Sequence, residues 1–76
     1  MIQIDERTSV YEDQANAVGI DGGTRNIEPI AFGFTRTECE NRADVQDYRD
    51  ATGTMPAIVE GFQSGYRGWV ALAPTL

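Results

Sequence analysis

The strongest structural signal in the sequence is the segment AIVEGFQSGYRGWVAL, residues 57–72. Two runs rich in β-branched and aromatic residues flank Ser64–Gly65, a pair typical of a tight hairpin turn. A turn centred on this pair places Val59 opposite Val70, and the alternation of side chains along each strand then gives the hairpin two faces. The face predicted to join the core carries Val59, Tyr66, Val70 and Leu72, and the other face carries Ile58, Phe62, Arg67 and Trp69.

Two further segments have the alternation of short strands. MIQID at residues 1–5 places isoleucines at every second position, and IEPIAFGFT at residues 27–35 alternates in the same way. Pro29 cannot donate a ladder hydrogen bond, so it belongs at the start of a strand or on an edge strand. In the second segment one face is predicted to carry Ile30, Phe32 and Phe34.

The segment SVYEDQANAV, residues 9–18, fits two structures. Ser9 and Glu12 form a capping box, which favours a short helix, whereas the valines at either end suit strands. Both alternatives stay open. The segment DGGTRN that follows, residues 21–26, is predicted to be a turn because paired glycines accept positive φ at no steric cost.

The middle of the chain has the signals of a helix over residues 37–52. A capping box marks its start, formed by Thr35 with Glu38 or by Thr37 with Glu40, and Gly53 is typical of its end. The sequence therefore predicts one α+β domain over residues 1–76. Its antiparallel sheet has three to five strands, the 37–52 helix packs on it, and a second short helix near 9–18 stays open.

Four acidic residues fall along one side of that predicted helix. They span ten residues, or about 15 Å at the rise of an α-helix. Like charges three or four residues apart cost a helix about 0.2–0.5 kcal/mol per pair, so the stripe is either an ordinary solvated surface or a surface kept to contact a basic groove. The stripe consists of Glu40, Asp44, Asp47 and Asp50.

A second candidate surface lies on the hairpin. Trp, Tyr and Arg dominate the energetics of protein interfaces, and an arginine stacked on an aromatic ring gains a cation–π interaction. The alternative is that the N-terminal segment covers this face as a second core layer. The candidate contact residues are Phe62, Tyr66, Arg67 and Trp69.

Composition excludes several kinds of chemistry. The 76 residues carry a net charge of −6, contain no His and contain one Cys. A catalytic triad with an imidazole base and a zinc site built from Cys and His are both excluded, so we expect no enzyme activity, cofactor or metal. The acidic balance disfavours direct binding to nucleic acid or an anionic membrane but permits a basic protein partner.

Features of targeting and membrane insertion are also absent from the sequence. No apolar run approaches the ~20 residues that span a bilayer, and MIQIDERTS does not have the pattern of a secretory signal. The single Cys permits no disulfide within the chain, which suits a reducing compartment. A cytoplasmic location is the expectation.

In size, acidity and lack of catalytic residues, the chain resembles the small phage-encoded anti-CRISPR and other anti-defence proteins, several of which mimic nucleic acid. The resemblance covers the whole chain and rests on the acidic stripe rather than on a motif. It implies a non-catalytic inhibitor that acts in the host cytoplasm. Its partner would be the basic nucleic-acid-binding surface of a CRISPR effector complex or a nuclease.

A different class of function also fits. A small structural or assembly protein, such as a virion component, would act through β-edge pairing and aromatic contacts. A homodimer is compatible with either function.

Overall fold

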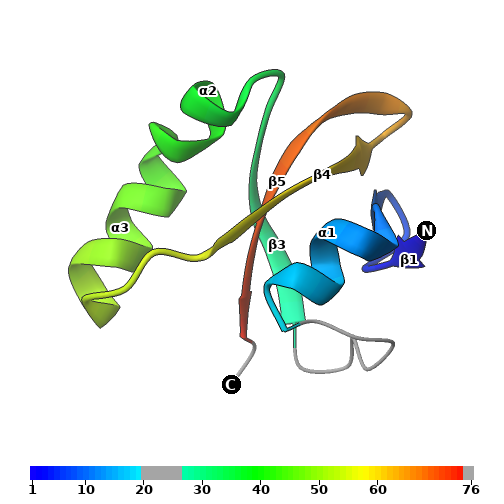
Figure 1. Ribbon diagram of the computed structural model, residues 1–76. Coiled ribbons are helices and arrows are strands. Elements are labelled where there is room, and N and C mark those ends of the chain that lie inside the picture. Colours follow the sequence, from blue (N-terminus) through cyan, green and yellow to red (C-terminus); the bar gives the residue numbers. More distant parts are fainter. Residues whose placement is uncertain (20–26, 75–76) are drawn as a thin grey trace.

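The computed structural model describes residues 1–19 and 27–74, which form an α+β fold (Figure 1). Within these residues five strands make one antiparallel sheet in the order β1–β2–β4–β5–β3, and three helices pack on it. The predicted fold class is confirmed, whereas the turn predicted at 21–26 lies outside the described residues. The strands are β1 (Ile2–Gln3), β2 (Thr8–Val10), β3 (Ile27–Gly33), β4 (Ala57–Gln63) and β5 (Tyr66–Pro74), and the helices are α1 (Glu12–Ala17), α2 (Arg36–Glu40) and α3 (Ala43–Thr52).

The β4–β5 hairpin has the register that its turn pair predicts. Ser64 and Gly65 both adopt positive φ, at 52° and 84°, and two such residues in succession match the twist of the strands on either side. Val59 consequently pairs with Val70, as predicted. Because β2 pairs with β4 and β3 pairs with β5, this hairpin is the centre of the sheet.

Both faces of the sheet are partly buried, each by different helices (Figure 1). On one face α1 covers a cluster of fully buried small side chains, and we call this the α1 face. On the opposite face, the α2–α3 face, a second cluster lies under α2 and α3. The buried members are Val10, Ala15, Val59, Val70 and Leu72 on the α1 face, and Cys39, Val45, Ile58 and Ala71 on the α2–α3 face.

The core is built from small aliphatic side chains and one cysteine. All seven aromatic residues lie in the described part of the chain, and each is either half-buried or exposed. Large rings usually supply much of the buried area of a small domain. Here the aromatic side chains lie around the core.

The predicted continuous helix over 37–52 is interrupted and forms two helices. Arg42 has extended backbone angles, φ −67° and ψ 144°, and separates α2 from α3. Cys39 and Val45 explain the break, since both are fully buried in one cluster. At about 100° per residue, these two side chains would point in directions about 120° apart on one continuous helix. The break allows both to face the sheet.

Strand β3 differs from its predicted alternation because it contains a bulge. The register shifts between Pro29 and Ala31, and the extra residue changes which face each later side chain occupies. Ile30 therefore packs against the cluster on the α2–α3 face, whereas Phe32 packs against the cluster on the α1 face. The prediction that they share a face was wrong. Pro29 does lie in an edge strand, as predicted.

The ambiguous segment 9–18 contains both of its alternatives in succession. Residues up to Val10 pair with β4, and a helix follows at Glu12–Ala17. The Ser9–Glu12 capping box does not form, because Tyr11 occupies the N-cap position. The backbone N–H of Tyr11 donates to the carbonyl oxygen of Glu60 at 3.1 Å, which extends the contact between this segment and β4.

Candidate partner-binding site

Three of the four predicted carboxylates lie together on α3. Asp44, Asp47 and Asp50 are exposed, and they lie about 100–160° around the helix from the buried Val45. Successive carboxylates are separated by about 4.5 Å of helix rise, so the set extends over about 9 Å. Among the residues that the structure describes, none of the three carboxylates forms an ion pair with an arginine. We call this set the α3 carboxylates.

Glu40 does not belong to this set. It lies on α2, and its Oε1 accepts from Nε of Arg36 at 2.9 Å. The predicted stripe of four residues is therefore a set of three plus one neutralised carboxylate. Sequence reasoning missed this pair because the helix was expected to start after Arg36, although the two residues have the i, i+4 spacing of a helical ion pair.

On the α2–α3 face, three half-buried aromatic side chains from β4, β5 and the N-cap of α1 lie near one another, and we call them the aromatic patch. Pairing of β4 with β5 places Trp69 beside Glu60. On the other edge of β4, the backbone N–H of Tyr11 donates a hydrogen bond to the carbonyl oxygen of Glu60. The ring of Phe62, in the next row of the sheet, lies 5.9 Å from the ring of Tyr11. The patch consists of Tyr11, Phe62 and Trp69.

Two arginines stack on this patch, each held by a carboxylate. The guanidinium of Arg67 lies 5.6 Å from the ring centroid of Tyr11, and its Nη2 donates to Glu60 at 3.2 Å. The guanidinium of Arg36 lies 5.6 Å from the ring centroid of Trp69 and is held by its bond to Glu40. The predicted cation–π interaction thus exists, but Arg67 stacks on Tyr11 instead of Trp69.

Tyr11 and Arg36 were missed from the sequence for the same reason. Tyr11 reaches the patch through the pairing of β2 with β4, and Arg36 reaches it through the packing of α2 on the sheet. Both contacts join segments that are distant along the chain. Neither residue stands out in its local sequence.

Tyr66 lies apart from the aromatic patch. Its ring meets Phe34 edge to face at 6.0 Å, and Phe34 meets Phe32 at 5.4 Å. Phe34 and Tyr66 are 60% and 62% exposed, so the predicted core position of Tyr66 was wrong because the strand begins beyond the buried cluster. We call Phe34 and Tyr66 the aromatic tip.

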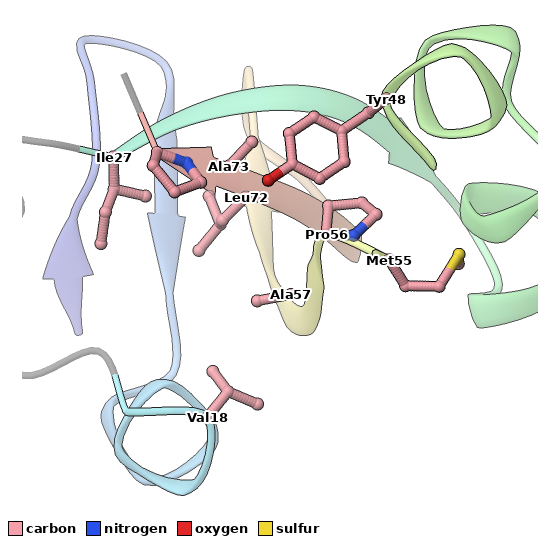
Figure 2. Close-up of a pocket in the computed structure, with 9 residues that line it drawn as sticks. Val18, Ile27, Tyr48, Met55, Pro56, Ala57, Leu72 and Ala73 are labelled. Carbon is pink, nitrogen blue, oxygen red and sulfur yellow. The ribbon is translucent and has the colours of Figure 1, made fainter. Parts of the chain in front are cut away.

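A pocket of about 200 Å³ lies where the ends of α1 and α3 meet the sheet (Figure 2). Tyr48 contributes a side-chain polar atom, and Figure 2 shows its hydroxyl pointing inward among Leu72, Ala73 and Pro56. Small-molecule sites usually occupy about 300–1,000 Å³, so this pocket is below the usual size. The pocket is lined by Val18, Ile27, Tyr48, Met55, Pro56, Ala57, Leu72, Ala73 and Pro74.

Cys39 is a core residue. Its side chain is fully buried, and burial raises the pKa of the thiol above the usual 9.0. Within residues 1–19 and 27–74, no cluster of three His, Cys, Asp or Glu side chains is placed to hold a metal ion.

None of the helices in the described ranges is long and apolar enough to cross a membrane. No family model matches the chain, and searches of curated proteins and of solved structures returned no significant match.

Proposed function

We propose that this chain is a non-catalytic inhibitor that binds a basic, nucleic-acid-binding surface of a partner protein. The observation that carries the proposal is the exposure of Asp44, Asp47 and Asp50 on the outward side of α3, away from every arginine ion pair that the structure describes. A short row of unneutralised carboxylates presents negative charge in the manner of phosphates along a nucleic-acid strand. By the family resemblance, the partner class is a CRISPR effector complex or a nuclease.

The distribution of the arginines supports this proposal. Arg36 forms an ion pair with Glu40, and Arg67 forms one with Glu60. Arg42 precedes α3 in extended backbone, and Arg49 lies about 40° around the helix from Val45, whereas the α3 carboxylates lie about 100–160° from it. The outward side of α3 keeps its negative charge, whereas Glu40 and Glu60 are paired.

The aromatic patch supplies a second kind of contact. A purely electrostatic contact is weakened by salt and contributes more to association rate and specificity than to affinity. Half-buried rings with stacked arginines are typical of the central residues of protein interfaces. We therefore assign the charged contact to α3 and part of the apolar contact to the aromatic patch and the aromatic tip.

The test compares two triple variants of equal net charge. Asp44→Asn, Asp47→Asn and Asp50→Asn remove the α3 carboxylates, and the control replaces Glu6, Glu12 and Glu28 by Gln. The three control residues are exposed and lie outside the recorded ion pairs. Each set includes one acidic residue in the first turn of a helix, so the change in the helix dipole interaction is also matched.

Each protein is used as bait in a bacterial lysate at low and high salt. A captured protein is then purified, and its binding to a labelled oligonucleotide is measured by fluorescence anisotropy with increasing wild-type chain. We expect the wild type and the control to displace the oligonucleotide, and the α3 variant to lose this ability. Capture that survives in the α3 variant, or that leaves oligonucleotide binding unchanged, would overturn the proposal.

One observation favours the alternative of an assembly protein, namely the exposed aromatic tip. Its β-edge component is less favoured, because β1 has two residues and β3 carries Pro29 and a bulge, which are features that oppose edge-to-edge pairing. The alternative predicts self-association that persists in high salt. Replacing Phe34 and Tyr66 by Ser would abolish it.

A further inference from the structure

The pocket at the ends of α1 and α3 has an exposed apolar edge (Figure 2). Val18 and Met55 both line it, and they are 46% and 45% exposed. In the described part of the chain five large apolar residues are exposed, and two of the five thus lie at this pocket. Exposed apolar side chains that gather around a cavity mark a place where another molecule docks.

The space in the pocket is left by small residues on the strands. Ala57 on β4 and Ala73 on β5 both line it, and larger side chains at these positions would occupy it. Gly53 ends α3 in the left-handed conformation, and the chain then passes through Met55 and the buried Pro56 into β4. The walls of the pocket are therefore parts of the framework of the domain.

The size and lining of the pocket suit one apolar side chain. An apolar cavity of roughly 150 Å³ holds a benzene ring, so a volume of about 200 Å³ accommodates one ring or one branched aliphatic group. Of the nine lining residues, only Tyr48 brings a side-chain oxygen or nitrogen, and its hydroxyl points inward (Figure 2). A phenol hydroxyl can donate to, or accept from, the backbone of a segment whose side chain enters the pocket.

The helices that border the pocket carry negative charge. Together α1 and α3 contain five acidic residues and one arginine. Asp44 lies one turn before Tyr48, about 40° around the helix and about 6 Å along its axis. Two residues of an extended segment span about 7 Å, so basic side chains two positions from an inserted residue can reach the α3 carboxylates.

We propose that this pocket receives one leucine-sized side chain from a basic segment of the partner protein, while the basic residues beside that side chain contact the α3 carboxylates. The inference rests on the proposed function and deepens it, because it adds an apolar anchor of stated size to the basic partner surface. Charge complementarity favours this occupant over an acidic or purely apolar one. A single side chain buried in a pocket is typical of the few residues that dominate the affinity of an interface.

The first experiment titrates the isotope-labelled chain with two blocked peptides, KKLKK and KKAKK, at low salt and follows the backbone amides by NMR. We expect both peptides to bind through charge and the leucine peptide to bind about tenfold more tightly, because it buries more apolar surface. The shifts specific to the leucine peptide should centre on Val18, Ala57 and Leu72. Equal dissociation constants, or leucine-specific shifts centred on Phe34 and Tyr66, would overturn the inference.

Variants separate the pocket from the charge. Ala57→Leu fills the pocket from its own wall, so the tenfold preference should disappear, and Tm should not fall because filling a cavity is commonly stabilising. Ala43→Leu makes the same substitution at an exposed position at the start of α3 and should keep the preference. The triple Asn variant of the α3 carboxylates should weaken both peptides and also keep the preference.

Two results with these variants would contradict the proposed arrangement. A leucine preference that survives in folded Ala57→Leu would place the leucine outside the pocket. Binding of both peptides that the triple Asn variant leaves unchanged would remove the charged half of the contact. If circular dichroism shows that Ala57→Leu is not folded, Met55→Ser at the exposed edge decides the matter by the same loss of preference.

Other outcomes separate this inference from the proposed function. A leucine preference in a chain that displaces oligonucleotide from no captured protein would refute the proposed function alone. Displacement that Ala57→Leu leaves at wild-type strength would refute the pocket inference alone. Free indole that shifts the lining residues, with equal binding of the two peptides, would overturn the inference in favour of a small-molecule site.

Discussion

Asp47 offers the most direct test of whether α3 keeps its charges at a cost to stability. It lies three residues from Asp44 and three residues from Asp50, so it takes part in two like-charge contacts on the helix. Each such contact costs about 0.2–0.5 kcal/mol. Asp47→Asn keeps the shape and nearly the same helix propensity, so it should raise the free energy of unfolding by about 0.4–1.0 kcal/mol.

The gain is measurable by thermal unfolding followed with circular dichroism. A domain of this size gains about 4–8 °C in Tm per kcal/mol, so the expected increase is about 2–8 °C at low ionic strength. In 1 M salt, where the Debye length is about 3 Å, the difference between variant and wild type should nearly vanish. Glu28→Gln on β3 removes the same charge outside the α3 set and is the matched control.

A Tm that Asp47→Asn leaves unchanged or lowers at low salt would show that Asp47 is not repelled by its neighbours. An increase that persists unchanged in 1 M salt would show that the effect is not electrostatic. If Tm rises as expected and the same substitution weakens binding to the partner, then Asp47 is kept for function at a cost to stability.

Three further outcomes follow from the structure. Gly33→Ala should lower Tm, followed by Trp69 fluorescence, because the new Cβ would lie 2.9 Å from Cα of Cys39 and overpacking costs about 1–3 kcal/mol; an unchanged Tm would show that α2 can shift freely. Cys39 is fully buried with a raised thiol pKa, so iodoacetamide at about pH 8 should alkylate it far more slowly in the folded chain than in denaturant; equal rates would contradict the burial. The pKa of Asp5 is lowered from 3.8 chiefly by the hydrogen bond from the Arg7 N–H, so its contribution to stability is present above 3.8 and is lost as pH falls through the lower folded pKa. Asp5→Asn should therefore show a shallower loss of Tm on acidification below that pH, and an identical slope would argue against the bond.

The parts of the fold that could be predicted from the sequence are those set by local chemistry. The hairpin register follows from the turn at Ser64–Gly65, and Gly53 ends α3 in the left-handed conformation expected of a helix C-terminus. The Thr35 side chain accepts from the backbone N–H of Glu38 at 3.1 Å, which is the N-cap hydrogen bond of one of the two predicted capping boxes.

The features that were missed depend on contacts between distant segments. The bulge in β3 fits that strand to β5 and leaves no local signature. The break between α2 and α3 allows Cys39 and Val45 to be buried together, and it separates Glu40 from the α3 carboxylates. The spacing of those two apolar residues was visible in the sequence, but only their shared burial shows that a continuous helix is incompatible with it.

The placement of all seven aromatic rings outside the fully buried core makes this domain favourable for mutagenesis. In most small proteins, truncating a Trp or Phe opens a large cavity, and the loss of folding obscures any effect on recognition. Here the fully buried core and most of the rings available to a partner are separate sets of residues. An alanine scan of Phe34, Phe62 and Tyr66, which lie outside both buried clusters, would therefore report mainly on recognition, and a scan of the valines mainly on folding.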